Sequence, residues 1–331
     1  MQNRFQPARR TLLGALAGAT LLPGASSTAW AQTYPSKPIR LVVAFGTGSG
    51  NDTIARELAR PLSEFLGQSV IVENRPGGGG SVGTDAVAKA APDGYTIGLG
   101  TSSQLVMNVG LYKTLPFDVE RDLRAIGLVS RTPLVLVAST AMPRTLRELI
   151  AYAKANPGKV TYGSGGTGSI SHIVGEAFAK AADITLLHVP YKGNGPALID
   201  LSGGHLNLLF DGLITGVPLA SQGRAHLLAV SGQTRSAIAP GLPTFAEQGM
   251  PTYEAYTWNN LIAPAQTPFA VIDKLNAALN KALATQAVRE RLAQGASEAL
   301  GPTTPEQADT YGKKERAQWV PFIRGLQIDI G

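Results

Sequence analysis

The segment KVTYGSGGTGS at residues 159–169 has closely spaced glycines directly after a β-rich run. Gly163, Gly165 and Gly168 match the dinucleotide-binding fingerprint G-x-G-x-x-G, and Asp183 follows twenty residues after the first of them. In that fingerprint the acidic residue ends the second strand, where it meets the ribose. Asp183 instead precedes the apolar run ITLLHV, so it would lie at the opposite edge of the sheet. The pattern therefore disfavours a nucleotide site.

A serine nucleophile is a second possible chemistry, because residues 79–83, GGSVG, match the nucleophile elbow G-x-S-x-G around Ser81. Ser169 lies in another glycine-rich segment. Hydrolysis would also require a histidine and an acid beside the serine. His172 is three residues from Ser169, where it could contact a ligand or cap the loop, and His188, in an apolar run, is expected to be structural. A secreted serine hydrolase is an alternative with little support.

The residue composition excludes further kinds of catalytic and metal-binding chemistry. The chain has no cysteine, which excludes disulfides, thiolate chemistry and a lipid-modified cysteine. It contains no carboxylate pair of glycosidase or metal-ligand character and no H-E-x-x-H pattern. We therefore expect no catalytic residue, no metal and no cofactor.

Four loops rich in glycine and small hydroxyl residues favour a different activity, the binding of an anion. They are GTGSGND at 46–52, GTSSQ at 100–104, GSGGTGSIS at 163–171 and YKGNG at 191–195. Glycine lets a ligand approach backbone N–H groups, and helix N-termini direct such donors at an anion. One such loop is ordinary in an α/β protein. Four loops from both halves of the chain indicate a polar or anionic small molecule.

Asp211 ends the apolar run LNLLFD and would lie at the same sheet edge as these loops. It would either line the ligand site or cap the helix expected near Leu213. If it lines the site, it would repel an anion unless it orients water or accepts a hydrogen bond from an amine, a hydroxyl or a protonated acid.

Beyond residue 33, short β-rich runs alternate with helical stretches, which is typical of parallel α/β layers. A second set of such runs begins with LVLVAS at 134–139, and the helices after residue 270 have no sheet of their own. The chain should therefore return to its first half. We expect a discontinuous first domain of residues 32–131 and 259–331 and a second domain of residues 132–258, joined by a hinge.

The first 31 residues predict a signal peptide. Three arginines precede a short apolar run, and Ala29-Trp30-Ala31 is a small-residue cleavage site before Gln32. The pair Arg9-Arg10 also allows a twin-arginine export route. The net charge of +6 falls to +3 without the leader arginines, which is too small to indicate nucleic-acid or membrane binding. We expect a periplasmic protein that binds no nucleic acid.

Seven spaced motifs resemble those of the periplasmic solute-binding receptors of tripartite tricarboxylate transporters, also called the Bug family. The motifs are YPSKPIRLVV (34–43), LGQSVIVENRPGGGG (66–80), APDGYT (91–96), LYKTLPFD (111–118), NPGKVTYGSGGTGS (156–169), HVPYKG (188–193) and LPTFAEQG (242–249). The resemblance implies a two-domain periplasmic-binding-protein (Venus flytrap) fold of class α/β, with two doubly wound sheets joined by a hinge.

The resemblance also implies that backbone amides and hydroxyls of strand-to-helix loops hold a ligand carboxylate. The implied ligand contacts are Phe45, Ser49, Gly50, Asn51, Asp52, Thr101, Ser102, Ser103, Gly165, Thr167, Ser169, Ser171, Tyr191, Lys192, Gly193 and Asp211. The chain departs from the family at residues 46–48, Gly-Thr-Gly, where a proline usually precedes the glycines. It departs again at Asn207, which replaces a frequent aspartate.

These observations together indicate an extracytoplasmic receptor, not an enzyme. It would capture a small carboxylate-bearing organic acid by hinge closure and deliver it to the membrane components of a tripartite tricarboxylate-type transporter, acting as a monomer. A sensor that binds the same ligand and docks on a membrane signalling protein is a further alternative. The identity of the acid is left open by the sequence.

Overall fold

The computed structural model describes residues 34–328 of the chain. The predicted signal peptide at residues 1–31 lies outside this range, as does the arginine pair on which the twin-arginine route depends. None of the described helices combines the length and the apolar character that crossing a bilayer requires.

The first sheet has the strand order β2-β1-β3-β9-β4, with β1 parallel to β2 and β3, and β9 antiparallel to β3 and β4. Its elements before β4 are β1 (Ile39–Val43), α1 (Gly50–Leu66), β2 (Val70–Asn74), η1 (Gly78–Gly80), α2 (Ser81–Ala88), β3 (Thr96–Thr101), η2 (Ser103–Met107), α3 (Asn108–Leu111) and α4 (Val119–Asp122). The elements around this sheet that come later in the chain are β9 (Tyr256–Pro264), α9 (Phe269–Ala284), α10 (Gln286–Gln294), β10 (Glu298–Ala299) and α11 (Pro305–Gly325).

The second sheet has the order β4-β7-β5-β6, and β8 also pairs with β4. β5 is parallel to β6 and β7, whereas β7 and β8 are antiparallel to β4. Its elements are α5 (Leu146–Ala155), β5 (Thr161–Ser164), α6 (Ile170–Ala182), β6 (Leu187–Pro190), α7 (Asn194–Ser202), β7 (Leu208–Gly212), α8 (Leu213–Ser221) and β8 (His226–Val230).

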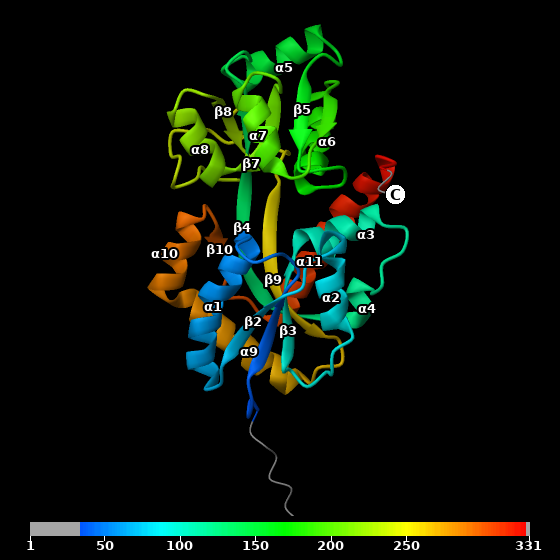
Figure 1. The fold of residues 1–331 in the computed structure, drawn as a ribbon, viewed down its shortest axis with the longest axis vertical. Coiled ribbons are helices and arrows are strands. Elements are labelled where there is room, and N and C mark those ends of the chain that lie inside the picture. Colours follow the sequence, from blue (N-terminus) through cyan, green and yellow to red (C-terminus); the bar gives the residue numbers. More distant parts are fainter. Residues whose placement is uncertain (1–33, 329–331) are drawn as a thin grey trace, which may run out of the picture. The chain divides into compact units, whose positions relative to one another are not determined.

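The strand β4 (Leu123–Ala138) belongs to both sheets (Figure 1). Residues 123–133 of β4 pair with β9, and residues 134–138 pair with β7 and β8. We call the elements around the first sheet the first lobe and those around the second sheet the second lobe. The predicted domain boundaries, at 131/132 and 258/259, fall within β4 and β9.

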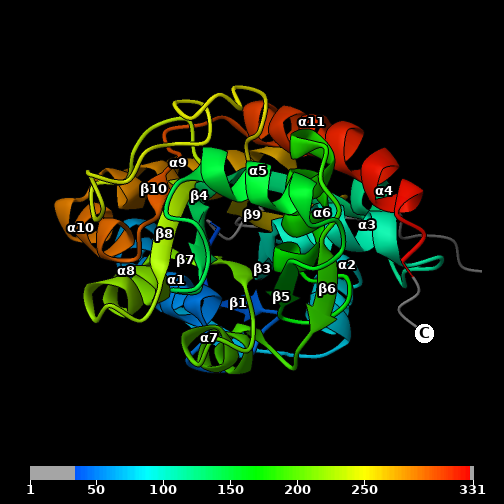
Figure 2. The ribbon, with the colours of Figure 1, turned by 90° about the horizontal axis from the view of Figure 1, so that it is seen from above.

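Helices cover both faces of the first sheet. Ile39, Leu41 and Val43 of β1 are buried in one core with residues of α1 and α9, whereas Val42 belongs to the core on the opposite face. On that opposite face α11 packs against β4, η2 and α3 (Figure 2). A strand that buries residues on both faces is typical of a doubly wound sheet.

The strand expected at residues 134–139 begins earlier in the structure, at Leu123. Arg131 and Pro133 interrupt the apolar pattern there, which is why the sequence did not indicate a strand. Arg131 Nε forms an ion pair with Glu298 Oε2 at 2.8 Å, and its guanidinium lies 4.4 Å from the centroid of the Tyr256 ring. The charge is compensated by residues distant in sequence. The antiparallel β4 and β9 also make the sheets mixed, where parallel layers were expected.

Candidate functional site

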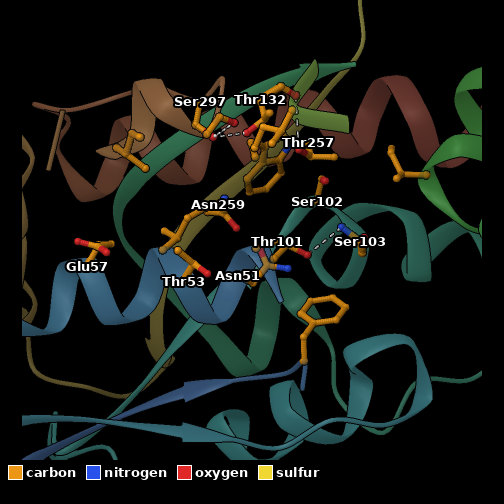
Figure 3. A pocket seen from close by; sticks show the side chains of 18 of the residues that line it. Asn51, Thr53, Glu57, Thr101, Ser102, Ser103, Thr132, Thr257, Asn259 and Ser297 are labelled. Carbon is orange, nitrogen blue, oxygen red and sulfur yellow. Dashed lines mark hydrogen bonds between the residues drawn. The ribbon is translucent and has the colours of Figure 1, made fainter. Parts of the chain in front are cut away.

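A cavity of about 470 Å³ lies between the start of α1, the end of β3, the strands β4 and β9, and α10 (Figure 3). It is lined by Phe45, Gly50, Asn51, Thr53, Ile54, Glu57, Thr101, Ser102, Ser103, Thr132, Ile170, Ile214, Thr257, Trp258, Asn259, Arg291, Leu292, Gly295 and Ser297. Beyond the crossing strands, the second lobe contributes Ile170, the first residue of α6, and Ile214 of α8.

The first turn of α1 presents backbone donors to this cavity. Ser49 is the N-cap: its side chain accepts from the Asp52 N–H at 3.2 Å, and its carbonyl accepts from the Thr53 N–H at 3.0 Å. The N–H groups of Gly50 and Asn51 precede the first intrahelical hydrogen bond, so they have no acceptor within the helix. Both residues line the cavity. Because the positive end of the helix dipole is also here, this turn is suited to bind an anion.

The carboxylate of Asp52 organises the loop before α1. Its Oδ2 accepts from Arg56 Nε at 3.0 Å and from the Gly48 N–H at 2.9 Å, and its Oδ1 accepts from Asn74 Nδ2 at 2.9 Å. These hydrogen bonds, led by that of Arg56, lower the pKa of Asp52 to about 2. Asp52 is buried and does not line the cavity. Its charge is balanced by Arg56, which weakens its repulsion of an anion at the start of α1.

The end of β3 supplies hydroxyl groups. The Thr101 hydroxyl is already engaged, because it donates to Gln104 Oε1 and accepts from the Ser103 N–H at 3.2 Å. In contrast, Ser102 Oγ is buried and has no hydrogen-bond partner among the described residues. Figure 3 shows Ser102, Ser103 and Asn51 around the same cavity. The hydroxyl of Ser102 therefore has unused hydrogen-bonding capacity at a residue that lines the cavity.

Asn259 on β9 is a second buried polar residue with an unused atom. Its Nδ2 donates to Ser130 Oγ at 3.2 Å, whereas its Oδ1 has no partner within residues 34–328. A serine hydroxyl can donate as well as accept, so rotating the amide by 180° would keep the contact with Ser130 and place Nδ2 where Oδ1 now lies. Leaving a buried polar atom unpaired costs about 1–3 kcal/mol, which a bound ligand would recover.

The polar residues predicted in the second lobe are hydrogen-bonded mainly to one another. Ser171 Oγ accepts from the Gly165 N–H at 2.9 Å and donates to Asn194 Oδ1 at 3.0 Å. Asn194 Nδ2 donates to Asp211 Oδ1 at 2.8 Å, and Asp211 Oδ2 accepts from Thr215 Oγ1 at 2.6 Å. This chain of contacts holds the loops together and occupies both carboxylate oxygens of Asp211.

His172 caps the glycine-rich loop, which is one of the two roles that the sequence left open. Its Nδ1 accepts from the Gly168 N–H at 3.0 Å, and its ring stacks on His188 with 3.8 Å between centroids. Burial lowers the pKa of His172 to about 4, and burial together with the neighbouring His172 lowers that of His188 to about 4. Both rings are therefore neutral at pH 7. Neither lines the cavity.

Four other predicted residues of the second lobe have structural or exposed positions. Ser169 is the N-cap of α6. The Tyr191 hydroxyl donates to Asp200 Oδ2 at 2.8 Å, and burial, followed by this contact, raises the pKa of Tyr191 to about 12. Thr167 and Lys192 are exposed.

The cavity is thus lined by only part of the set of ligand contacts that we predicted. The predicted residues that line the cavity are Phe45, Gly50, Asn51, Thr101, Ser102 and Ser103. Those outside its lining are Ser49, Asp52, Gly165, Thr167, Ser169, Ser171, Tyr191, Lys192, Gly193 and Asp211.

The sequence analysis missed the part of the cavity formed by later turns of α1 and by α10. Thr53, Ile54 and Glu57 follow Gly50 at helical spacing, so the face of the predicted helix could have indicated them. Arg291 on α10 gave no such signal, because α10 meets α1 only through tertiary packing.

The geometry gives no support to the catalytic alternatives. Ser81 Oγ accepts from Asn108 Nδ2 at 3.2 Å, and no histidine or acidic side chain hydrogen-bonds to it in the described part of the chain. Asp183 follows the last residue of α6 and pairs with Lys154, so it lies at the opposite end of that helix from the glycine-rich loop. Within residues 34–328, no group of three or more histidines and acidic residues is placed to hold a metal ion.

Comparisons with known proteins agree with this geometry. The family model described as "Tripartite tricarboxylate transporter family receptor" matches residues 54–328. BugT of Bordetella pertussis is 38% identical over 304 residues, which cover 91% of this chain and 93% of BugT.

Two solved structures are also similar. A protein from R. palustris, solved with adipate, has a TM-score of 0.77 and 32% identity, and the match covers 89% of this chain and 99% of that one. MatC from Rhodopseudomonas palustris, with bound malate, has a TM-score of 0.74 and 28% identity, covering 88% of this chain and 100% of MatC. The predicted two-domain α/β fold of the periplasmic-binding-protein type is confirmed. The chain belongs to the receptor family of the tripartite tricarboxylate transporters, whose members are solute-binding proteins and not enzymes.

Proposed function

We propose that this chain is a periplasmic receptor that captures a small carboxylate-bearing organic acid and delivers it to the membrane components of a tripartite tricarboxylate-type transporter. The observation that carries this proposal is the buried hydroxyl of Ser102, which has no hydrogen-bond partner among the described residues and belongs to a residue that lines the cavity together with Gly50 and Asn51. The receptor would act as a monomer.

A carboxylate fits the donors at this end of the cavity. It is an acceptor with two oxygens, and the N–H groups of Gly50 and Asn51 and the hydroxyl of Ser102 could each donate to it. A hydrogen bond to a charged group contributes about 1.5–3 kcal/mol. Several such bonds, offset by the loss of motion and hydration, reach the roughly 8 kcal/mol of a micromolar complex. No arginine is required.

The named ligands of two relatives support the same ligand class. Adipate and malate, the ligands of the two R. palustris structures, are both carboxylates. The shared fold makes a carboxylate the first class of ligand to test on this chain.

Capture would involve movement of the second lobe. We take residues 32–131 and 259–331 as one domain, residues 132–258 as the other, and β4 and β9 as the hinge. Ile170 and Ile214 already line the cavity from the second lobe, so closure would press these two apolar side chains onto the ligand.

The test is binding of carboxylates to the chain that begins at Gln32. A thermal-shift panel of hexanoate, phenylacetate, adipate, malate and citrate would identify binders, and calorimetry would give their Kd. Ser102→Ala should raise the Kd of the tightest binder roughly tenfold to a hundredfold, because it removes one hydrogen bond to a charged group.

Ser139→Ala is the matched control. Ser139 is buried and its hydroxyl also lacks a partner among the described residues, but it does not line the cavity. This variant should bind like the wild type. The proposal is contradicted if no carboxylate stabilises the protein, or if Ser102→Ala binds as tightly as Ser139→Ala.

A further inference from the structure

The cavity extends beyond the proposed carboxylate contacts along one face of α1. Gly50, Ile54 and Glu57 are at positions i, i+4 and i+7 of this helix, and all three line the cavity. From Asn51 to Glu57 the helix rises by about 9 Å. In Figure 3, Ser102 lies on one side of the cavity and Glu57 on the other. A ligand held at the first turn of α1 would therefore direct its far end towards Glu57.

The walls of the cavity carry apolar side chains. Ile54 from α1, Trp258 from β9 and Leu292 from α10 belong to the first lobe, and Ile170 and Ile214 belong to the second. These side chains favour a methylene chain or an aromatic ring over a hydrated group, because burial of apolar surface is favourable. The body of the ligand is thus expected to be apolar.

An ion pair lies at the far end of the cavity. Arg291 Nε is 3.1 Å from Glu57 Oε1, and Arg291 Nη1 donates to Gln294 Oε1 at 3.1 Å. Among the described residues that line the cavity, Glu57 and Arg291 are the only ones with a full charge. Their charges cancel, so the far end is electrically neutral overall.

This pairing disfavours a second carboxylate on the ligand. The only lining cation, Arg291, already has an anionic partner in Glu57. A second ligand carboxylate would either lie beside Glu57 without compensation or displace it and leave Glu57 unpaired. An uncharged ligand end leaves the ion pair intact.

We propose that this cavity selects acids with one carboxylate and an apolar body, and that Glu57 is the residue that rejects a second carboxylate. The inference rests on the proposed function, because it takes the first carboxylate to be held at the start of α1.

Hexanoate and adipate are a matched pair for the first test, because they share a six-carbon chain and differ in one terminal carboxylate. Calorimetry on the wild-type chain should give a Kd for hexanoate that is roughly tenfold or more below the Kd for adipate. The reason is that adipate brings an uncompensated charge to Glu57. Adipate binding as tightly as hexanoate, or more tightly, would overturn the inference.

The second test assigns the selection to Glu57. Glu57→Gln keeps the size of the side chain and removes its charge, which leaves Arg291 free to pair with the second carboxylate of adipate. We expect the Kd of adipate to fall roughly tenfold relative to that of hexanoate. The ion pair is partly exposed, so the unfolding temperature should change little.

Glu64→Gln is the control for this variant. Glu64 is on the same helix and also pairs with an arginine, in this case Arg60 of the same helix, whose Nε is 3.3 Å from Glu64 Oε1, but Glu64 does not line the cavity. This change should leave the ratio of the two Kd values as in the wild type.

The outcomes separate the two proposals. If Glu57→Gln leaves the adipate-to-hexanoate ratio unchanged, Glu57 is not the selecting residue and the inference fails, while the receptor function stands. If no acid of the panel binds to the wild-type chain, the proposed function itself fails.

Discussion

The loop before α1 and the loop before α6 contain the same tetrapeptide, Gly-Thr-Gly-Ser, at residues 46–49 and 166–169. In both, the serine is the N-cap, with φ −67° and ψ 159° at Ser49 and φ −65° and ψ 161° at Ser169. The glycine before it is left-handed in both, with φ 83° at Gly48 and 79° at Gly168. Two distant segments thus form the same helix start, one in each lobe.

The two helix starts differ in the residues that follow the cap. The third helical residue accepts the glycine N–H in both, but it is Asp52 in α1 and His172 in α6. The first helical residue is Gly50 in α1 and Ile170 in α6. Glycine leaves the backbone N–H groups open to a ligand, whereas isoleucine presents an apolar side chain to the cavity.

Because both lobes have the same glycine-rich loop, the loop alone is not sufficient to form an anion-binding site. The loop and its cap set the helix start, which offers unpaired N–H groups in both lobes. We propose that the first helical residue then determines whether a ligand can reach them. We therefore interpret α1 as the anion-binding start and α6 as an apolar surface that closes over the ligand.

The largest expected effect comes from making the first start resemble the second. Gly50→Ile should raise the Kd of the tightest carboxylate at least about a hundredfold, because it blocks hydrogen bonds that contribute about 1.5–3 kcal/mol each. A Cβ at Gly50 meets no atom within 4 Å, so the backbone there leaves room for the start of a side chain. Calorimetry and thermal unfolding of the same sample would separate the two effects.

The reverse substitution, Ile170→Gly, provides the counterpart. This change removes only an apolar contact, so the Kd of the variant for the tightest carboxylate should rise by no more than about tenfold. A greater loss of affinity in Ile170→Gly than in Gly50→Ile would reverse the roles that we assign to the two helix starts.

The next largest effect is on the free energy of unfolding, because the ionisable residues at the two helix starts titrate in different pH ranges. The pKa of His172 and that of His188 are lowered from 6.5 to about 4, so the unfolded state binds more protons between these values. The free energy of unfolding should therefore rise with pH from about 4 to 6.5, by up to about 1.4 kcal/mol per pH unit for each histidine. The contribution of Asp52, whose pKa is lowered from 3.8 to about 2, is present above pH 3.8 and is lost as the pH falls to 2.

Urea unfolding at a series of pH values would measure how the free energy of unfolding changes over both pH ranges. His172→Gln keeps an acceptor for the Gly168 N–H and should reduce the slope between pH 4 and 6.5, whereas Asp52→Asn should reduce only the loss at lower pH. A slope between pH 4 and 6.5 that is the same in His172→Gln and in the wild type would contradict the buried, neutral state of this ring.

The smallest effect is a spectroscopic one. Trp258 lines the cavity between the two helix starts and donates from Nε1 to Glu315 Oε2 at 3.0 Å, whereas Trp319 is on α11 and outside the lining. In the Trp319→Phe variant we expect a change in tryptophan emission that saturates at the Kd measured by calorimetry. The same change in Trp258→Phe would show that the signal does not come from the cavity.

Much of the fold could be predicted because its elements are encoded locally. The helix α5 (Leu146–Ala155), for example, begins directly after Thr145, whose side chain caps it by accepting from the Glu148 N–H. The first half of β4 could not be predicted, because Arg131 is compatible with a strand only when Glu298 and Tyr256 compensate its charge.

The candidate site was predictable to a lesser degree. Gly50, Asn51 and Ser102, which we predicted as ligand contacts, line the cavity, since they follow strand ends at the same edge of the sheet. Ser171 and Asp211 have the same sequence character, yet their polar atoms are used by Asn194 and other loop residues. Composition does not reveal whether a polar group has a partner.

The sequence by itself determined the alternation of strands and helices and the two capped helix starts, because a cap depends on residues within one turn. It also carried the motifs of the receptor family. Only the tertiary structure decided that Ser102 is left without a partner among residues 34–328, at a cavity, and that Glu57 meets Arg291 across two helices. Burial and charge pairing depend on segments that are distant in the chain, and these two properties determine which of the many small polar residues can bind a ligand.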